Sequence, residues 1–212
     1  MMKKKLLILG TGGNALDVYD TVVEKYDLLG FLDDDETKQA SFSYRDHKVI
    51  GPLSAVSEYP DAELVFAIGS TRNHTQRLSI LDKLGLKNQP ERFPIVIAKG
   101  ANVSPSAKLG QGVILLAGAQ VGANTHIENF VWALQNCVFS HDSKIGAGTI
   151  AACGVIVSGD VKIGPSCYLG AGSVIKDGLT IAGETLIGAG ATVVSDINDT
   201  GIYTGVPARM RS

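Results

Sequence analysis

The chain has 212 residues, enough for one or two domains, and 45% of them are hydrophobic, which excludes a wholly disordered protein. Nineteen basic and twenty-one acidic residues give a net charge of −2, so the chain has no overall basic field to hold nucleic acid or an anionic membrane surface. Three cysteines without C-x-x-C spacing disfavour a disulfide scaffold and a zinc knuckle, and they favour free thiols.

The N-terminus briefly imitates a signal peptide. Lysines precede an apolar run, but this run ends at Gly10, too early for the hydrophobic core of a signal sequence. No later apolar stretch reaches about 18 residues, so no membrane-spanning helix is predicted. We therefore expect a cytoplasmic protein.

Residues 1–90 are predicted to form a small Rossmann-like α/β domain, because apolar strands alternate with amphipathic helices and Pro90 begins a linker. Strands that alternate with helices favour a parallel sheet, with a ligand crevice at the C-terminal ends of its strands. The expected elements are strand 5–9, helix 15–25, strand 28–32, strand 64–68 and helix 72–84.

The first strand leads into the turn Gly10-x-Gly12-x-x-Ala15, which satisfies the dinucleotide fingerprint, and Asp33 follows where a ribose partner would lie. Glycines there would let a phosphate approach the N–H groups at a helix N-terminus. The domain is too short for a full two-half Rossmann fold, so a mononucleotide or a nucleotide sugar fits it better than NAD. A glycine-rich turn without a ligand is the structural alternative.

A repeat of six residues dominates the rest of the chain. From Val103 to Val193 every sixth residue is apolar, and thirteen of these sixteen are Val, Leu or Ile, without an insertion. A period of six fits neither a helix nor a simple strand, but it fits a parallel β-helix of hexapeptide repeats over residues 91–212. Three hexads would close one triangular coil, so residues 18 apart should stack on each other. Glycines recur at the second position, where we expect them to relieve awkward backbone angles at the corners.

His141 is the candidate catalytic residue of the repeat. An imidazole can act as a base near neutral pH, and the adjacent Asp142 could orient it. Gly159 follows 18 residues later, so its N–H could stabilise an oxyanion beside the base. A solvated corner histidine is the alternative. Of the four histidines, His126 and His141 alone lie in the repeat, so a three-histidine zinc site is not expected, and His126 should face solvent.

Five segments carry a family resemblance: Gly-Thr-Gly-Gly-Asn, Phe-Leu-Asp-Asp, Ala-Ile-Gly-Ser, Ser-His-Asp-Ser-Lys-Ile-Gly and the tail Gly-Ile-Tyr-Thr-Gly-Val-Pro-Ala-Arg. In these segments, and in their order, the chain resembles the bacterial sugar acetyltransferases of the PglD/NeuD type over almost its whole length. The resemblance implies a nucleotide-sugar domain followed by a left-handed β-helix with a C-terminal tail. It also implies a homotrimer that binds acetyl-CoA between neighbouring β-helices. No metal is expected, because the repeat has too few histidines for a zinc site.

The resemblance also implies roles for individual residues. His141 matches the family's general base, Asp142 its acidic neighbour and Gly159 the oxyanion donor. Ala171 and Ala189, themselves 18 apart, match backbone contacts to acetyl-CoA. The residues that match substrate contacts are Gly12, Gly13, Asn14, Asp33, Asp34 and Gly69. The chain departs from the family at Asn14, where His is common, and at Leu134 and Ile150, so the exact sugar stays open.

The expected function is N-acetylation of a nucleotide-linked amino sugar of the UDP-4-amino-4,6-dideoxy type, by direct transfer from acetyl-CoA with a histidine base. The nearest alternative is O-acetylation of sialic acid or another surface polysaccharide sugar. A non-catalytic, nucleotide-sensing trimer is an alternative of a different class, and NAD-dependent chemistry is a third.

Overall fold

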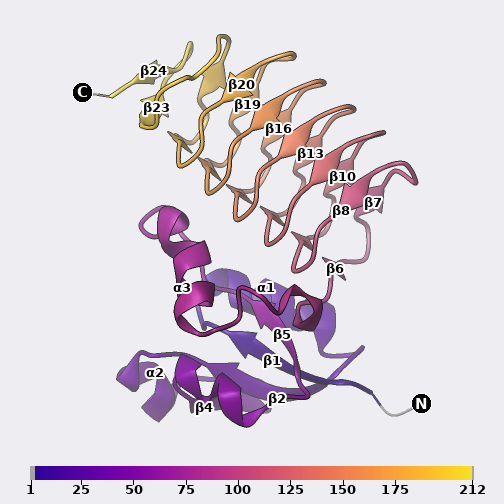
Figure 1. Ribbon diagram of the computed structural model, residues 1–212, viewed down its shortest axis with the longest axis vertical. Coiled ribbons are helices and arrows are strands. Elements are labelled where there is room, and N and C mark those ends of the chain that lie inside the picture. Colours follow the sequence, from indigo (N-terminus) through magenta and orange to yellow (C-terminus); the bar gives the residue numbers. More distant parts are fainter. Residues whose placement is uncertain (1–2, 212) are drawn as a thin grey trace.

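A computed structural model describes residues 3–211 (Figure 1). An α/β unit occupies one end of the molecule and a stack of triangular coils the other, joined through β6 (Val96–Ile97). The elements of the α/β unit, with η for a 3₁₀ helix, are β1 (Lys5–Leu9), α1 (Gly13–Val22), β2 (Asp27–Leu32), α2 (Glu36–Ser41), β3 (Ser43–Tyr44), β4 (His47–Gly51), η1 (Leu53–Glu58), β5 (Glu63–Phe66), η2 (His74–Gln76), α3 (Arg77–Lys83) and η3 (Pro90–Arg92).

The sheet of the α/β unit has the strand order β3-β4-β2-β1-β5. β1 pairs in parallel with β2 and β5, and β2 pairs in parallel with β4, as the alternation of strands and helices predicted. Alternate residues of β1 enter different clusters: Leu6 packs beside Val18 of α1, whereas Leu7 packs beside Leu81 of α3. Helices cover both faces of this sheet, which explains why β1 is apolar from Leu6 to Leu9.

The helices of this unit lie close to their expected places, with two differences. α1 begins at Gly13 and ends at Val22, so the expected helix 15–25 is shifted toward the N-terminus. In the expected helix 72–84, the first turn is the 3₁₀ helix η2, and α3 begins at Arg77. The Asn73 side chain accepts a hydrogen bond from the Ser70 N–H (2.7 Å), which holds this segment as a turn before the helix.

The second part of the chain is a left-handed parallel β-helix with three faces. The face toward the α/β unit, here called the domain face, contains β6, β9 (Ile114–Leu115), β12 (Trp132–Ala133), β15 (Ile150–Ala151), β18 (Tyr168–Leu169), β21 (Leu186–Ile187), β23 (Ile202–Thr204) and β24 (Arg209–Met210). The second face contains β7 (Asn102–Val103), β10 (Gln120–Val121), β13 (Val138–Phe139), β16 (Ile156–Val157), β19 (Val174–Ile175) and β22 (Thr192–Val193). The third face contains β8 (Lys108–Leu109), β11 (His126–Ile127), β14 (Lys144–Ile145), β17 (Lys162–Ile163) and β20 (Thr180–Ile181).

The predicted register of 18 residues is present. On the second face Val121 pairs with Phe139, and Phe139 pairs with Val157. First-position side chains point inward and form one continuous core, and only Val103 and Leu109, in the first coil, are half-buried. The repeat therefore builds its core from the first-position residues together with buried fifth-position residues such as Val113 and Val131.

The role expected of the second-position glycines was wrong. The left-handed backbone angles lie at the fourth position of the hexads, for example at Asn124 (φ 57°) and Asp142 (φ 60°). The second-position glycines have other backbone angles but lie against the next coil: a Cβ on Gly146 would lie 2.5 Å from the carbonyl carbon of Gly164. Close stacking of coils, rather than strain, thus excludes side chains there.

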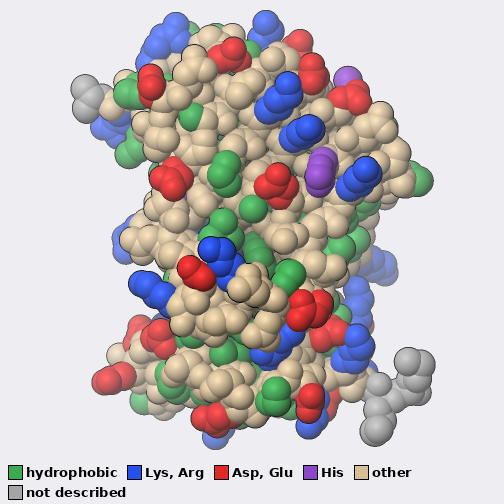
Figure 2. Space-filling model, in the orientation of Figure 1, with side chains coloured by type: hydrophobic (Ala, Val, Ile, Leu, Met, Phe, Trp, Pro, Cys, Tyr) green, Lys and Arg blue, Asp and Glu red, His purple; other side chains and the backbone are tan. Residues whose placement is uncertain are grey.

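The two parts of the chain share a buried apolar cluster. Ile114, Trp132 and Ile150 of the domain face pack in one cluster with Ala15 and Val18 of α1. The division of the chain into 1–90 and 91–212 stays a prediction. Within residues 3–211 no helix is long and apolar enough to cross a membrane. In the face of the molecule shown in Figure 2, acidic and basic side chains are interspersed without a large field of one sign, which fits the net charge of −2.

The inward and outward positions of one strand should differ sharply in their effect on stability. Ile145→Ala should lower the free energy of unfolding by about 2–5 kcal/mol, because Ile145 is fully buried in the β-helix core. The control is Lys144→Ala at the exposed neighbouring position of β14, which should stay within about 0.5 kcal/mol of the unmodified protein. Urea unfolding at one fixed protein concentration measures both. Equal losses would contradict the inward orientation of the first position.

Candidate active site

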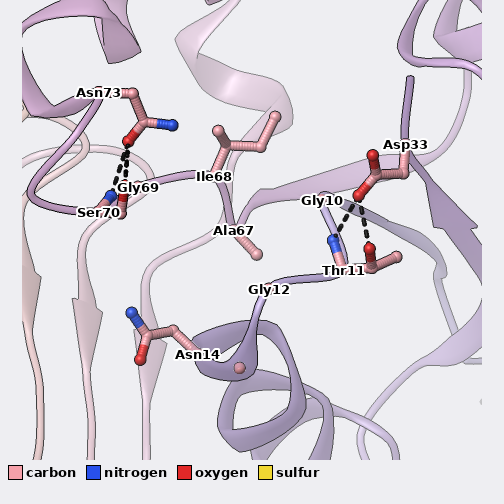
Figure 3. Close-up of a pocket in the computed structure, with 11 residues that line it drawn as sticks. Gly10, Thr11, Gly12, Asn14, Asp33, Ala67, Ile68, Gly69, Ser70 and Asn73 are labelled. Atoms are coloured by element: carbon pink, nitrogen blue, oxygen red, sulfur yellow. Dashed lines mark hydrogen bonds between the residues drawn. The ribbon is translucent and has the colours of Figure 1, made fainter. Parts of the chain in front are cut away.

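A pocket of about 280 Å³ opens at the C-terminal ends of β1 and β5 (Figure 3). It is lined by Gly10, Thr11, Gly12, Gly13, Asn14, Asp33, Ala67, Ile68, Gly69, Ser70 and Asn73. The structure thus brings together five of the six substrate residues expected from the sequence. Asp34 does not line the pocket: its carboxylate accepts a hydrogen bond from the Leu53 N–H (2.8 Å) at the start of η1.

The glycines of the pocket differ in what a side chain at their position would contact. Gly10 has a φ of +100°, and a Cβ there would lie 2.7 Å from the Ile68 side chain, so the fold itself requires it. A Cβ on Gly12 or Gly13 would meet no atom within 4 Å. Gly12 is also the N-cap of α1 and offers no side-chain oxygen to the first N–H groups of this helix. Open space beside unsatisfied N–H groups is the arrangement that accepts a phosphate.

Asp33 holds the glycine-rich loop in place. One of its carboxylate oxygens accepts hydrogen bonds from the Thr11 N–H (2.9 Å) and the Thr11 hydroxyl (2.6 Å), and the other accepts from the Asp35 N–H (3.0 Å). On the opposite side of the pocket, the Ser70 N–H and hydroxyl both donate to Asn73 Oδ1 (Figure 3). Thr11, Ser70 and Asn73 were not predicted as site residues from the sequence, although the Ser-x-x-Asn spacing is a turn signal.

The candidate base forms the predicted pair with its neighbour. His141 Nδ1 lies 2.8 Å from Asp142 Oδ2, and Asn124 Nδ2 donates to the other carboxylate oxygen at 3.1 Å. These hydrogen bonds, from His141 first and Asn124 second, hold the pKa of Asp142 below its ordinary value. An ionised carboxylate only accepts, so Nδ1 carries the proton and Nε2 is left free to accept one. Asn124 was missed, although it precedes Asp142 by the same 18 residues.

Gly159 lies directly against the imidazole. A Cβ on Gly159 would be 2.7 Å from His141 Nε2 and 2.6 Å from Cε1. Any side chain at position 159 would therefore displace the imidazole ring from its present position. The Asp160 N–H donates to the His141 carbonyl (3.0 Å), which ties the two coils together at this point. Within residues 3–211 the Gly159 N–H has no hydrogen-bond partner, so it is available to an oxygen that develops negative charge beside Nε2.

His141 is accessible to a ligand. Its side chain is 66% exposed, and it borders a shallow hollow of about 380 Å³ on the second face. The hollow is lined by Asn102, Gln120, Val121, Gly122, Ala123, Val138, Phe139, Ser140 and His141. His126, by comparison, is exposed at the outward position of β11 on the third face, as expected.

The remaining candidates lie apart from His141 in one chain. Ala171 and Ala189 are exposed on successive coils, at the edge between the domain face and the second face. His141 and Gly159 lie at the edge between the second and third faces, which is opposite the domain face. The pocket at the C-terminal ends of β1 and β5 abuts the domain face, since a Cβ on Gly69 would lie 2.6 Å from Ile150 Cδ1. One chain therefore holds three separate parts of the candidate site.

All three cysteines are free thiols, as expected; Cys137 and Cys167 are buried, which raises their thiol pKa values to about 12 and about 11, and Cys153 is exposed. Across residues 3–211, no three or more His, Cys, Asp or Glu side chains lie close enough together to hold a metal ion.

Comparisons with known proteins agree with this geometry. Residues 5–84 match the family model of the PglD N-terminal domain, and residues 142–177 match the bacterial transferase hexapeptide (six repeats). No match was found among curated proteins. The acetyltransferase domain of PglB from Neisseria gonorrhoeae is similar with a TM-score of 0.87 and 27% identity, covering 98% of this chain and 100% of that chain.

Two further solved structures carry ligands. The same PglB domain in complex with acetyl coenzyme A has a TM-score of 0.85 and 28% identity, covering 99% of this chain and 100% of that chain. PerB from Caulobacter crescentus, in complex with CoA and GDP-perosamine, has a TM-score of 0.84 and 27% identity, covering 98% of this chain and 97% of that chain.

The β-helix, with its exposed histidine, and the matches together define an enzyme of the hexapeptide acyltransferase class, and the prediction of an acetyltransferase is confirmed. The N-terminal match and the coverage of both parts of the chain narrow this class. In both of its parts the chain is similar to the PglD/NeuD-type sugar acetyltransferases, as its sequence motifs predicted.

Proposed function

We propose that this protein transfers the acetyl group of acetyl-CoA to the amino group of a nucleotide-linked amino sugar. The observation that carries the proposal is a glycine-lined pocket in the same chain as an exposed His141–Asp142 pair stacked on Gly159. The similar PerB structure contains CoA and GDP-perosamine, and a variant of that enzyme is described as a GDP-perosamine N-acetyl transferase. N-acetylation is therefore favoured over O-acetylation, and acetyl-CoA is the donor.

In this proposal the N-terminal pocket holds the nucleotide sugar. The first N–H groups of α1 donate hydrogen bonds to phosphate oxygens. Gly12 and Gly13 have no side chains, which leaves room for the phosphate there. Asn14 extends from the start of α1 toward the side of the pocket formed by Gly69 and Ser70 (Figure 3), where it can contact the ligand. Asp33 acts by holding the Thr11 loop, since both its carboxylate oxygens already accept hydrogen bonds.

The transfer is a direct attack of the sugar amine on the thioester carbonyl. His141 Nε2 takes a proton from the amine as the new C–N bond forms, and Asp142 stabilises the resulting imidazolium. The Gly159 N–H donates to the oxyanion of the tetrahedral intermediate. When this intermediate collapses, the C–S bond breaks and CoA leaves as a thiolate, which takes the proton from His141 and returns it to its starting state.

We propose that the active site is completed between subunits of a homotrimer. In one chain the pocket lies on the domain face and His141 on the opposite edge, so the sugar is presented to His141 of a neighbouring subunit. In a cleft between two β-helices, Ala171 and Ala189 of one chain would likewise lie beside His141 of the next chain. Acetyl-CoA would bind in this cleft. The cytoplasmic location stays a prediction.

An acceptor panel tests this function. The full chain is incubated with acetyl-CoA and UDP- or GDP-linked 4-amino-4,6-dideoxy sugars, sialic acid or CMP-sialic acid, and CoA release and product mass are followed. A base-stable acetylated amine as the product supports the proposal. Comparison of kcat/KM for the UDP-linked and GDP-linked sugars then identifies the preferred nucleotide. A base-labile acetyl ester would favour the O-acetyltransferase. If the protein binds a nucleotide sugar but neither turns it over nor binds acetyl-CoA, the nucleotide-sensing trimer is favoured.

Gly12→Ala tests the assignment of the pocket. Its methyl group would enter the space proposed for the phosphates, so the KM for the nucleotide sugar should rise about 10-fold. The fold should tolerate the change, because φ is −64° and no protein atom lies within 4 Å of the new Cβ. Steady-state kinetics and thermal unfolding measure the two effects.

The matched control is Gly201→Ala, where the atoms nearest the Cβ would belong to the Met210 and Tyr203 side chains, at 3.2 Å or more. It should leave both KM values unchanged. If Gly12→Ala behaves like this control, the nucleotide sugar does not bind against the start of α1.

A further inference from the structure

Arg77, the first residue of α3, is fully buried between the α/β unit and the β-helix. Within residues 3–211 no carboxylate forms a salt bridge with it. Its guanidinium instead lies over the rings of Trp132 on the domain face (4.5 Å to the centroid) and Phe66 at the end of β5 (5.3 Å). The charge thus lies where the two parts of the chain meet.

Three backbone carbonyls receive the hydrogen bonds of Arg77. Nε donates to the Ile68 carbonyl (2.8 Å), and Ile68 lines the pocket at the C-terminal ends of β1 and β5. Nη1 donates to the carbonyls of Phe130 (3.0 Å) and Gly148 (2.6 Å), which are the fourth residues of hexads in successive coils. One side chain therefore holds a wall of the pocket against two coils of the β-helix.

The loop after β5 has little freedom to move past Arg77. A Cβ on Gly69 would lie 2.9 Å from Arg77 Nε and 2.6 Å from Ile150 Cδ1. Gly69 is thus packed between the arginine and the domain face, and its missing side chain permits this close approach. The position of the loop on the β-helix depends on where the guanidinium lies.

Stability alone is a weak reason for a charge at this place. Burial lowers the pKa of Arg77 to about 9, and Nη2 has no hydrogen-bond partner in the described part of the chain. An apolar side chain of similar length could fill the same volume without this desolvation cost. The planar guanidinium group of Arg77, however, has N–H groups in fixed directions. It therefore sets the relative positions of the three carbonyls, which an apolar contact does not do.

We propose that Arg77 is a positioning residue for acetyl transfer. Through the Ile68 carbonyl it fixes the pocket on the β-helix, and so it determines where the acceptor amine is presented to the base. The inference rests on the proposed function, because it requires that the pocket holds the acceptor. Arg77 itself touches neither substrate.

Arg77→Met is the test, measured on the full chain with the acceptor found by the panel. The kcat/KM for the acceptor should fall about 10–100-fold, because misplacement by about 1 Å is costly in a transfer reaction. The KM for acetyl-CoA should stay within about two-fold, since the β-helix keeps its structure. Arg77→Lys, which keeps the charge but loses the planar guanidinium group, should give a smaller loss in the same parameter, and it replaces Arg77→Met if that variant does not fold.

Arg92→Met is the matched control. Arg92 also donates to backbone carbonyls, those of Tyr59 (2.7 Å) and Ala62 (3.1 Å), but these lie within the α/β unit and away from the pocket. This variant should lose stability and keep its kinetic constants. Two results would indicate a merely structural role for Arg77 and overturn the inference. One is an equal loss of kcat/KM in Arg77→Met and Arg92→Met; the other is a loss in Arg77→Met that is as large for acetyl-CoA as for the acceptor.

Hydrogen exchange separates failure of this inference from failure of the proposed function. In Arg77→Met, exchange of residues 67–73 should rise about 10-fold relative to Arg92→Met, whether or not an acceptor is known. If the unmodified protein acetylates no nucleotide sugar, the proposed function fails, and unchanged exchange in this segment then overturns the role of Arg77 as well. Unchanged exchange in an active enzyme overturns the role of Arg77 alone.

Discussion

Replacement of His141 by Ala should lower kcat/KM for the acceptor by about 10²–10⁴-fold, the usual contribution of a general base. The fold should be unaffected, because the imidazole is 66% exposed and its hydrogen bond with the Asp142 side chain lies at the surface. Turnover is measured by CoA release, and assembly and thermal unfolding are compared with those of the unmodified protein. Retained turnover would remove His141 from the mechanism.

His126→Ala is the matched control for this variant. His126 is an exposed histidine of the neighbouring strand β11, it points away from the core, and it lies outside the hollow beside His141. Its loss should change kcat/KM by less than about two-fold, within the range of a neutral surface substitution. A similar loss in both variants would indicate that surface charge, rather than proton transfer, governs the rate.

Gly159→Ala should have the second-largest effect, a fall in kcat of about 10²-fold, because the new methyl group would displace the imidazole by about 1 Å. The added Cβ would lie 2.6–2.7 Å from His141 Cε1 and Nε2, which is closer than real Cβ contacts. If the substitution acts by displacing the base, the double variant with His141→Ala should be little slower than His141→Ala alone.

Gly183→Ala is the control for crowding at the same hexad position. Gly183 lies on a different edge, and its Cβ would meet Pro165 at 3.0 Å, so this variant should lose some stability but keep its kcat. Kinetics and thermal unfolding of both variants distinguish the two effects. Equal losses of kcat would show that coil distortion alone slows the enzyme, and the contact with His141 would then carry no special weight.

The β-helix was predictable because its period is unusually informative. An apolar residue at every sixth position from Val103 to Val193 admits one stacking register, and this register already brought His141 beside Gly159. The same arithmetic could have found Asn124, which lies one coil before Asp142. The glycine assignment failed because sequence spacing does not separate a strained backbone angle from a close approach between coils.

The α/β unit was less predictable. Its apolar strands were found within two residues, but α2, β3, β4 and η1 were not expected, because short elements with mixed polarity leave no clear periodicity. Asp33 and Asp34 are neighbours with similar chemistry, yet one holds the pocket loop and the other caps the start of η1. Hydrogen bonds of this kind depend on which backbone groups lie nearby, and local sequence does not record that.

The sequence by itself determined the coil, its register and the stacking of His141 beside Gly159, since these follow from a strict local repeat. The tertiary structure alone decided that the pocket lies on the domain face while His141 lies on the opposite edge, and that Arg77 joins the pocket to two coils. The hydrogen bonds of Arg77 to Phe130 and Gly148 join residues 53 and 71 positions apart, across a surface where no repeat relates the two sides. Packing of two differently built parts, rather than periodicity, sets them.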